Sequence, residues 1–169
     1  MLEKFRPSYH YKSIGEIEPD FFKKHGIRFV MLDIDNTLVG NNIPEPDEKA
    51  LLFLQRLKRE GIAAALVSNN HSRRVQSFNR DLGLPAAYRA GKPMTWKMRR
   101  MMKKIGADPK QTAFIGDQLF TDIYGANRLG VISILVDPIS RGRENKFFDL
   151  KRKLEQWVFK RLEKEAHRV

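Results

Sequence analysis

Two aspartates stand directly after an apolar run of the chain, and this arrangement limits the folds that the chain can adopt. The run, Ile27 to Leu32, predicts a buried strand, and Asp33 and Asp35 follow it. Because residues two apart share a face of an extended chain, both carboxylates should project together where the strand leaves the core. Two such anions repel each other unless a cation lies beside them. A divalent ion such as Mg2+ meets this need, because it prefers oxygen ligands.

The same segment has a simpler interpretation. Asp33 and Asp35 can be solvated residues that begin a loop, with Asn36 and Thr37 supplying ordinary turn chemistry. The choice between the two interpretations depends on the other strand ends of the chain.

Three further motifs favour the functional interpretation. Ser68-Asn69-Asn70 ends a second apolar run and precedes a predicted helix, where hydroxyl and backbone N–H donors suit an anion. Lys92 precedes another helix and can neutralise a phosphate or a carboxylate. Gly116 and Asp117 follow a third predicted strand, with Asp122 further along. The carboxyl ends of parallel strands meet at one crevice, so these motifs support one another.

Strands and helices alternate along the chain. The predicted strands are 27–32, 62–67, 111–115 and 131–136, with a short one near 86–89. The predicted helices are 20–25, 47–60, 71–82, 95–105, 119–129 and 144–168. This order predicts an α/β fold with three layers, in which helices cover both faces of a Rossmann-like parallel sheet.

Apolar residues at helical spacing predict which helix faces lie inside. Leu51, Leu54 and Leu57 should point inward from one helix, and Met94, Met98, Met101, Met102 and Ile105 from another. In the C-terminal helix the apolar face contains Phe147, Leu150, Leu154, Trp157, Val158 and Leu162. Docking on the sheet is the favoured interpretation of that face, and a surface-lying membrane helix is the alternative.

The four motifs together resemble those of the haloacid dehalogenase (HAD) superfamily of aspartate-nucleophile phosphatases: DxDxT, a strand-ending Ser or Thr, a Lys, and GDxxxxD. The resemblance covers roughly residues 27–137 and implies the HAD fold. It implies that Asp33 attacks phosphorus and becomes an aspartyl-phosphate. It also implies that Asp35 protonates the leaving oxygen and later activates water.

The resemblance further implies how cofactor and phosphate are held. Mg2+ would take carboxylate oxygens of Asp33 and Asp117 and the backbone carbonyl of Asp35. Around these ligands, Asp122 would orient metal waters or the lysine, and Thr37 would support the loop. The predicted phosphate-binding residues are Ser68, Asn69 and Lys92. Residues that could flank the site mouth are His71, Arg73 and Arg74.

The short connections between the motifs predict that no cap domain is inserted, as in HAD subfamily IIIA. Within that group the DxDNTL form of the first motif resembles the bacterial YqeG family, which is similar to phosphatidylglycerophosphate phosphatases. The resemblance therefore implies an anionic phospholipid substrate that is converted to phosphatidylglycerol. Two alternatives remain open: a phosphatase for a protein, nucleotide or sugar phosphate, and a noncatalytic RNA-binding or ribosome-binding module.

Composition is consistent with one domain over residues 1–169, with an N-terminal lead (1–26), a catalytic core (27–137) and a basic amphipathic helix (144–168). A net charge of +12 favours anionic partners. Cysteine is absent, which excludes disulfides, and no apolar stretch is long enough to span a bilayer. We expect a cytoplasmic protein that can bind the inner face of the membrane. Nucleic acid is a less favoured partner, and the sequence does not define the oligomeric state.

Overall fold

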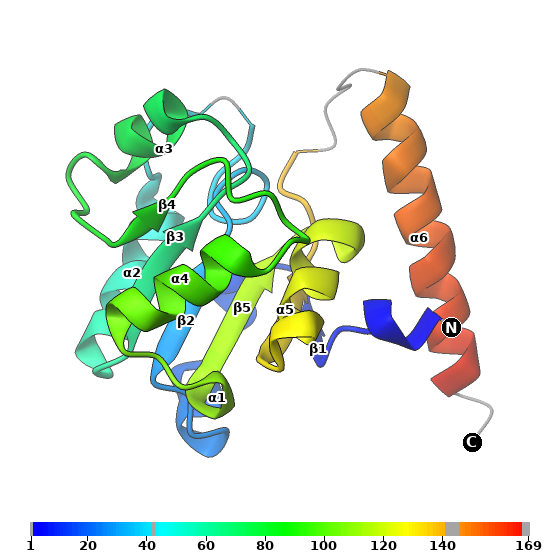
Figure 1. Ribbon diagram of the computed structural model, residues 1–169, viewed down its shortest axis with the longest axis horizontal. Helices are drawn as coiled ribbons and strands as arrows, with labels where there is room; N and C mark the ends of the chain where they lie inside the picture. The colour runs from blue at the N-terminus through cyan, green and yellow to red at the C-terminus, as the bar shows by residue number, and fades with distance from the viewer. Residues whose placement is uncertain (1, 42, 141–145, 167–169) are drawn as a thin grey trace.

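Six parallel strands form one sheet in the order β1-β6-β5-β2-β3-β4. The computed structural model describes residues 2–41, 43–140 and 146–166. The strands are β1 (Tyr9–Tyr11), β2 (Phe29–Leu32), β3 (Ala63–Val67), β4 (Ala86–Ala87), β5 (Thr112–Gly116) and β6 (Ile132–Val136). In Figure 1 they run side by side through the centre of the domain.

Helices cover both faces of this sheet. The α-helices are α1 (Pro19–Lys24), α2 (Glu48–Arg59), α3 (Ser72–Asn79), α4 (Trp96–Ile105), α5 (Tyr124–Leu129) and α6 (Lys146–Ala166). Short 3-10 helices are η1 (Leu2–Phe5), η2 (Ile14–Glu16) and η3 (Pro109–Gln111), and η4 (Leu119–Ile123) is a π-helix. The predicted α/β fold with a parallel sheet is confirmed.

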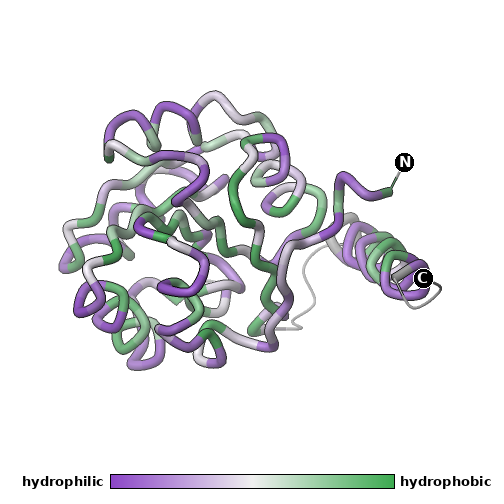
Figure 2. Tube along the Cα trace, turned by 90° about the horizontal axis from the view of Figure 1, so that it is seen from below, coloured by the Kyte–Doolittle hydropathy of each residue, from purple (hydrophilic) through white to green (hydrophobic). Residues whose placement is uncertain are grey.

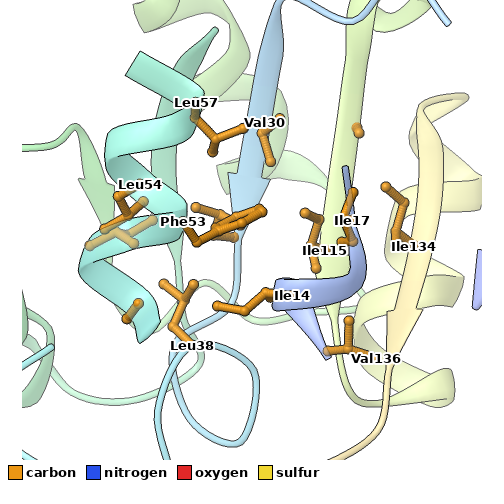
Figure 3. Packing of buried hydrophobic residues seen from close by; sticks show 14 of the residues in the cluster. Ile14, Ile17, Val30, Leu38, Phe53, Leu54, Leu57, Ile115, Ile134 and Val136 are labelled. Carbon is orange, nitrogen blue, oxygen red and sulfur yellow. The ribbon is translucent and has the colours of Figure 1, made fainter. Parts of the chain in front are cut away.

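Alternation of side chains along β2 divides the core into two layers. Val30 and Leu32 point into the larger cluster, whereas Met31 points into the smaller one on the opposite face. The larger cluster contains residues of α1, α2 and α3, and Figure 3 shows Phe53 and Leu57 of α2 against the sheet. The smaller cluster is built on α4 and α5. Both faces of β2 are therefore buried, which explains its unbroken apolar sequence.

The position of β2 determines where the site forms. It pairs with β3 on one side and with β5 on the other. The chain runs outward from β2 through β3 to β4, and then returns to β5 and continues to β6. The carboxyl ends of these central strands are therefore neighbours at the point where the strand order reverses.

The connections at this edge are short. Among the described residues, α2 is the only helix between β2 and β3, and α3 is the only one between β3 and β4. The domain therefore has no separate cap, as predicted. The N-terminal lead contains an unpredicted strand, β1, which pairs with β6 at the sheet edge.

Two residues that were predicted to point inward are exposed. Leu51 of α2 is exposed while Leu54 and Leu57 are buried, because Phe53 takes the core position instead. Met94 is also exposed, because it precedes the first turn of α4, whereas Met98, Met101 and Met102 lie in the core.

The predicted apolar face of α6 is divided in the structure. Val158 and Leu162 are buried, but Leu150, Leu154 and Trp157 are exposed. The helix packs on η1 and η4 along one edge of the domain, and Figure 2 shows it nearly end on beside the N-terminal segment. Glu144 and Arg168, the predicted ends of this helix, and the side chain of Phe147 lie outside the described residues.

Candidate active site

An ion-paired cluster lies at the carboxyl ends of β2 and β5. The Lys92 Nζ is 2.8 Å from Asp33 Oδ1 and 2.8 Å from Asp122 Oδ1. All three side chains are at most 8% exposed. One lysine therefore neutralises two carboxylates. The two aspartates are far apart in the sequence, but their side chains share one buried space.

Burial dominates the ionisation of this cluster. It raises the pKa of Asp33 to about 7, with Lys92 opposing this shift and Asp122 and Asp117 adding to it. Burial alone would lower the pKa of Lys92, but Asp122 and Asp33 raise it above its ordinary value. The lysine consequently stays charged. The pKa of Asp33, about 7, lies close to neutral pH, so Asp33 changes charge in that range.

Asn69 fixes the loop that carries Lys92. Its side-chain oxygen accepts from the Lys92 backbone N–H at 2.8 Å, and its amide nitrogen donates to the Lys92 carbonyl at 3.1 Å. Asn69 was predicted to bind phosphate directly, whereas its side chain here joins the loop after β3 to the loop before α4. Ser68 is buried beside it, and its hydroxyl accepts from the Asn70 backbone N–H at 3.1 Å.

The glycine before Asp117 leaves room for Asp122. A β-carbon on Gly116 would lie 2.5 Å from the Asp122 side chain. That side chain is fully buried, and its Oδ2 accepts from the Gln118 backbone N–H at 3.1 Å. Glycine at position 116 is therefore a steric requirement of the site.

Carboxylate oxygens of Asp33, Asp117 and Asp122 lie within 4.8 Å of one another. Three buried oxygen donors at this spacing fit a hard divalent cation, since such an ion requires oxygen ligands and neutralises their mutual repulsion. Asp33 and Asp117 were predicted as metal ligands, and Asp122 was predicted to act from behind them. In the structure a carboxylate oxygen of Asp122 lies in the same group as those of Asp33 and Asp117, and Asp122 also pairs with Lys92.

Arg152 of α6 pairs with Asp117, and sequence reasoning missed this contact. Its guanidinium donates to an Asp117 carboxylate oxygen and, at 3.0 Å, to the Asp117 carbonyl. It also lies 3.6 Å from Glu155. Burial raises the pKa of Asp117 to about 6, and Arg152 limits this rise. Nothing in the sequence distinguishes Arg152 from the other basic residues of its helix.

Asp35 does not belong to the group of three buried carboxylates, and its side chain pairs with Arg74 and Asn70. Its Oδ1 accepts from Arg74 Nε at 3.1 Å and Nη2 at 2.9 Å, and its Oδ2 accepts from Asn70 at 3.2 Å. The Asp35 side chain is 19% exposed, so solvent reaches it. Arg74 was predicted at the site mouth, and the structure pairs it with one of the predicted catalytic carboxylates.

The turn after Asp35 supports the neighbouring groups. Asn36 adopts a φ of 63°, in the left-handed region that asparagine tolerates, and its side-chain oxygen accepts from Ser140 Oγ at 2.5 Å. Thr37 Oγ1 donates to Asp117 Oδ1 at 3.3 Å. Thr37 therefore contacts a site carboxylate from within the loop.

Two of the predicted mouth residues have no contact with the buried carboxylates. His71 caps the N-terminus of α3 by accepting from the Arg74 backbone N–H at 3.2 Å, and it is exposed. Arg73 is also exposed on α3. Both lie at the strand-end edge of the domain.

A cavity of about 430 Å³ adjoins the cluster between β6 and α6. Its lining includes Asp117, Arg152, Asp137 and Phe159. Of the three buried carboxylates, Asp117 is the one that lines this cavity.

The fold and the site together define a class of protein. The chain belongs to the haloacid dehalogenase-like hydrolases, the family that matches residues 9–130. It is 35% identical over 170 residues to the probable phosphatase YqeG of Bacillus subtilis (strain 168), with 99% of this chain and 97% of that protein covered. The predicted family is confirmed, and the protein is a HAD-type phosphatase that acts on a phosphorylated substrate.

Two further likenesses are more distant. The chain is 24% identical over 164 residues to phosphatidylglycerophosphate phosphatase 1, chloroplastic/mitochondrial, of Arabidopsis thaliana, covering 92% of this chain and 47% of that protein. It thus spans about half of that relative. The fold is similar, with a TM-score of 0.53 and 21% identity, to the cobalt-bound deoxy-D-mannose-octulosonate 8-phosphate phosphatase (YrbI) of Haemophilus influenzae, covering 82% and 90% of the two chains.

No helix within the described ranges has the length and apolar character needed to cross a bilayer.

Proposed function

We propose that the protein hydrolyses a phosphomonoester through a phosphorylated Asp33. The observation that carries this proposal is the buried pair between Asp33 and Lys92, whose atoms lie 2.8 Å apart. The pair supplies a carboxylate nucleophile at a strand end and a fixed cation beside it. Such an arrangement suits phosphoryl transfer, in which positioning and charge neutralisation account for most of the catalysis.

The first step forms the aspartyl-phosphate. An Asp33 carboxylate oxygen attacks phosphorus, the bond from phosphorus to the leaving oxygen breaks, and Asp35 gives its proton to that oxygen. Arg74 and Asn70 hold Asp35 at the solvent side of the site, which is where a leaving alcohol must depart. Proton donation prevents the build-up of an alkoxide.

The second step returns the enzyme to its starting state. Asp35, now ionised, takes a proton from a water molecule, and the oxygen of that water attacks phosphorus. The bond between phosphorus and Asp33 then breaks, which releases inorganic phosphate. In this mechanism Lys92 and the Ser68 hydroxyl contact phosphoryl oxygens, and Asn69 acts through the loop that carries Lys92, to which it makes two hydrogen bonds.

Mg2+ is the metal that we assign to this site. Asp33 and Asp117 would hold it with their carboxylates, and Asp35 with its backbone carbonyl. The ion would supply positive charge for the transferring phosphoryl group.

Phosphatidylglycerophosphate is the substrate that we propose. The named activity of the Arabidopsis relative supports it, and so does the net charge of +12, which favours an anionic substrate surface. The short connections around the site also leave room for a substrate presented on a large surface.

The test is Mg2+-dependent phosphate release from phosphatidylglycerophosphate in mixed micelles beside soluble phosphomonoesters. Asp33→Asn should lower turnover by about three orders of magnitude or more. It should also abolish labelling of the protein by a substrate whose phosphoryl group is radioactive. Asp108→Asn is the matched control, because Asp108 lies before the other end of β5 and caps η3. Equal activity of Asp33→Asn and wild type would refute the mechanism, and turnover of soluble esters alone would refute the lipid substrate.

A further inference from the structure

Helix α6 has two apolar faces, of which only one is covered. Its inner face packs Val158 and Leu162 into a cluster with residues of η4 and β6. Leu150, Leu154 and Trp157 form the second face and are 57%, 49% and 55% exposed. Their spacing of four and three residues places them in one stripe along the helix. Core packing therefore accounts for the inner face but not for this outer stripe.

Basic side chains border the outer stripe. At 100° per residue, the exposed basic residues beside Leu150 and Trp157 on the helix surface are Lys153, Lys160, Arg161 and Lys164, and the exposed Asp149 lies next to Lys160 in angle around the helix axis. The Arg161 guanidinium lies 5.6 Å from the centre of the Trp157 ring. Glu155 is on the inner face and 4% exposed, and Glu165 pairs with Arg161 at 3.7 Å. The outer stripe thus combines large apolar groups with positive charge.

The same helix reaches the active site. Arg152, on the inner side of α6, contacts Asp117, while Leu154 and Trp157 point outward. Figure 1 shows α6 standing at the side of the domain next to β1 and the N-terminal segment. A surface that received the outer stripe would therefore lie on the side of α6 opposite the Arg152 contact with Asp117.

We propose that the outer face of α6 docks the enzyme on an anionic lipid bilayer. The helix would lie in the plane of the interface, with Leu150, Leu154 and Trp157 among the acyl chains and the flanking lysines at the head groups. Tryptophan suits this boundary because its ring is apolar and its N–H is polar. Negative lipid charge complements the basic border of the stripe. This inference rests on the proposed lipid substrate and specifies how the enzyme reaches it.

Two other occupants make different demands on this surface. RNA would bind the lysines and Arg161 through its phosphates and would gain little from Leu150 or Leu154. A second copy of the chain would bring two basic faces together, which repel each other. The combination of aliphatic, tryptophan and basic groups matches a lipid interface better than either.

Vesicle co-sedimentation of the full chain tests the proposal. Wild type should bind phosphatidylcholine vesicles that contain phosphatidylglycerol and bind pure phosphatidylcholine much less. The triple variant Leu150→Gln/Leu154→Gln/Trp157→Gln should lose affinity by roughly tenfold or more, because its apolar anchors are gone. The matched control is Leu51→Gln/Leu52→Gln, which changes exposed leucines on α2. Equal losses in both variants, or no loss in either, would overturn the proposal.

Fluorescence identifies the segment that enters the bilayer. The chain contains two tryptophans, so Trp96→Phe leaves Trp157 as the reporter. Emission should shift to the blue with anionic vesicles in this variant and stay unchanged in Trp157→Phe. A shift confined to Trp157→Phe would overturn the proposal, because Trp96 would then be the membrane contact.

Soluble-ester turnover separates failure of docking from failure of the proposed function. The triple variant should hydrolyse a soluble phosphomonoester at the wild-type rate, because its three residues lie outside the buried cluster. Docking with no hydrolysis of phosphatidylglycerophosphate would support the surface and refute the substrate. Retention on RNA or self-association that depends on the three residues, without vesicle binding, would overturn the proposal.

Discussion

Lys92 and Arg152 both neutralise buried carboxylates, but the protein holds them in different ways. Lys92 sits in a short loop that Asn69 ties down, and its side chain is 2% exposed. Arg152 belongs to α6 at the edge of the domain, and its side chain is 23% exposed. The charge on Asp33 is thus balanced from within the core, whereas the charge on Asp117 is balanced by a peripheral helix. Replacing Arg152 should therefore disturb the sheet less than replacing Lys92.

Removing Lys92 should have the largest effect. Lys92→Met leaves Asp33 and Asp122 without their common cation, so we expect the free energy of unfolding to fall by about 3–5 kcal/mol. Urea unfolding of the metal-free protein near pH 8 measures it. Lys97→Met is the control, because Lys97 Nζ donates to backbone carbonyls nearby rather than to buried carboxylates. A loss no greater than that of the control would mean that Lys92 is not an essential cation of the core.

The pH dependence of Mg2+ binding is the next largest effect. The pKa values of about 7 for Asp33 and about 6 for Asp117 mean that both are mostly protonated at pH 5 in the metal-free protein. Mg2+ must displace those protons, so its affinity should rise about a hundredfold or more between pH 5 and pH 8 and level off above pH 7. Calorimetric titrations across this range measure it.

The same raised pKa values predict the stability of the metal-free protein. The folded state holds protons that the unfolded chain releases near the ordinary aspartate pKa of 3.8. The free energy of unfolding should therefore fall as pH rises from about 4 to about 7. Metal affinity and stability that do not change with pH would contradict the assigned ionisation.

Replacing Arg152 tests whether the peripheral cation competes with a metal. Arg152→Met removes a positive charge beside Asp117, and Mg2+ affinity should increase by roughly tenfold or more. Calorimetry detects this directly, without substrate. Arg161→Met on the outer side of the same helix is the control and should leave the affinity unchanged. Weaker binding by Arg152→Met would show that the arginine supports the metal site instead.

Thr37→Val should have the smallest effect. The substitution removes one hydrogen bond to Asp117 Oδ1 and keeps the side-chain shape, so Mg2+ affinity should change by about threefold at most. The same calorimetric titration measures it. A change as large as that in Arg152→Met would place Thr37 among the principal determinants of the charge on Asp117.

Sequence patterns predicted the site residues at the strand ends, but they missed the contact from α6 and the strand at the sheet edge. Asp33, Lys92 and Asp117 follow or precede regular elements, so local patterns indicate where they lie. The contact of Arg152 with Asp117 depends on how α6 packs at the domain edge, which no local pattern encodes. The same holds for β1, whose three residues acquire strand structure only by pairing with β6.

Helical spacing also predicted too wide a buried face for α6. Val158 and Trp157 are neighbours in the sequence and were assigned to one side, yet one is buried and the other exposed. A helix that packs against only one edge of a domain buries a narrow stripe, so apolar residues next to that stripe remain in solvent. The length of the apolar pattern identifies the helix but not the width of its contact.

The pairing of β1 with β6 has a consequence for the order of events during synthesis. Ser8, just before β1, hydrogen-bonds to Ser133 of β6, 125 residues away. A nascent chain emerging from the ribosome therefore cannot close this edge until all six strands of the described sheet have been made. The larger core around β2 and β3 can assemble earlier, because its contacts are nearer in sequence. Of the six strands of this sheet, β1 is made first and should be the last to join it.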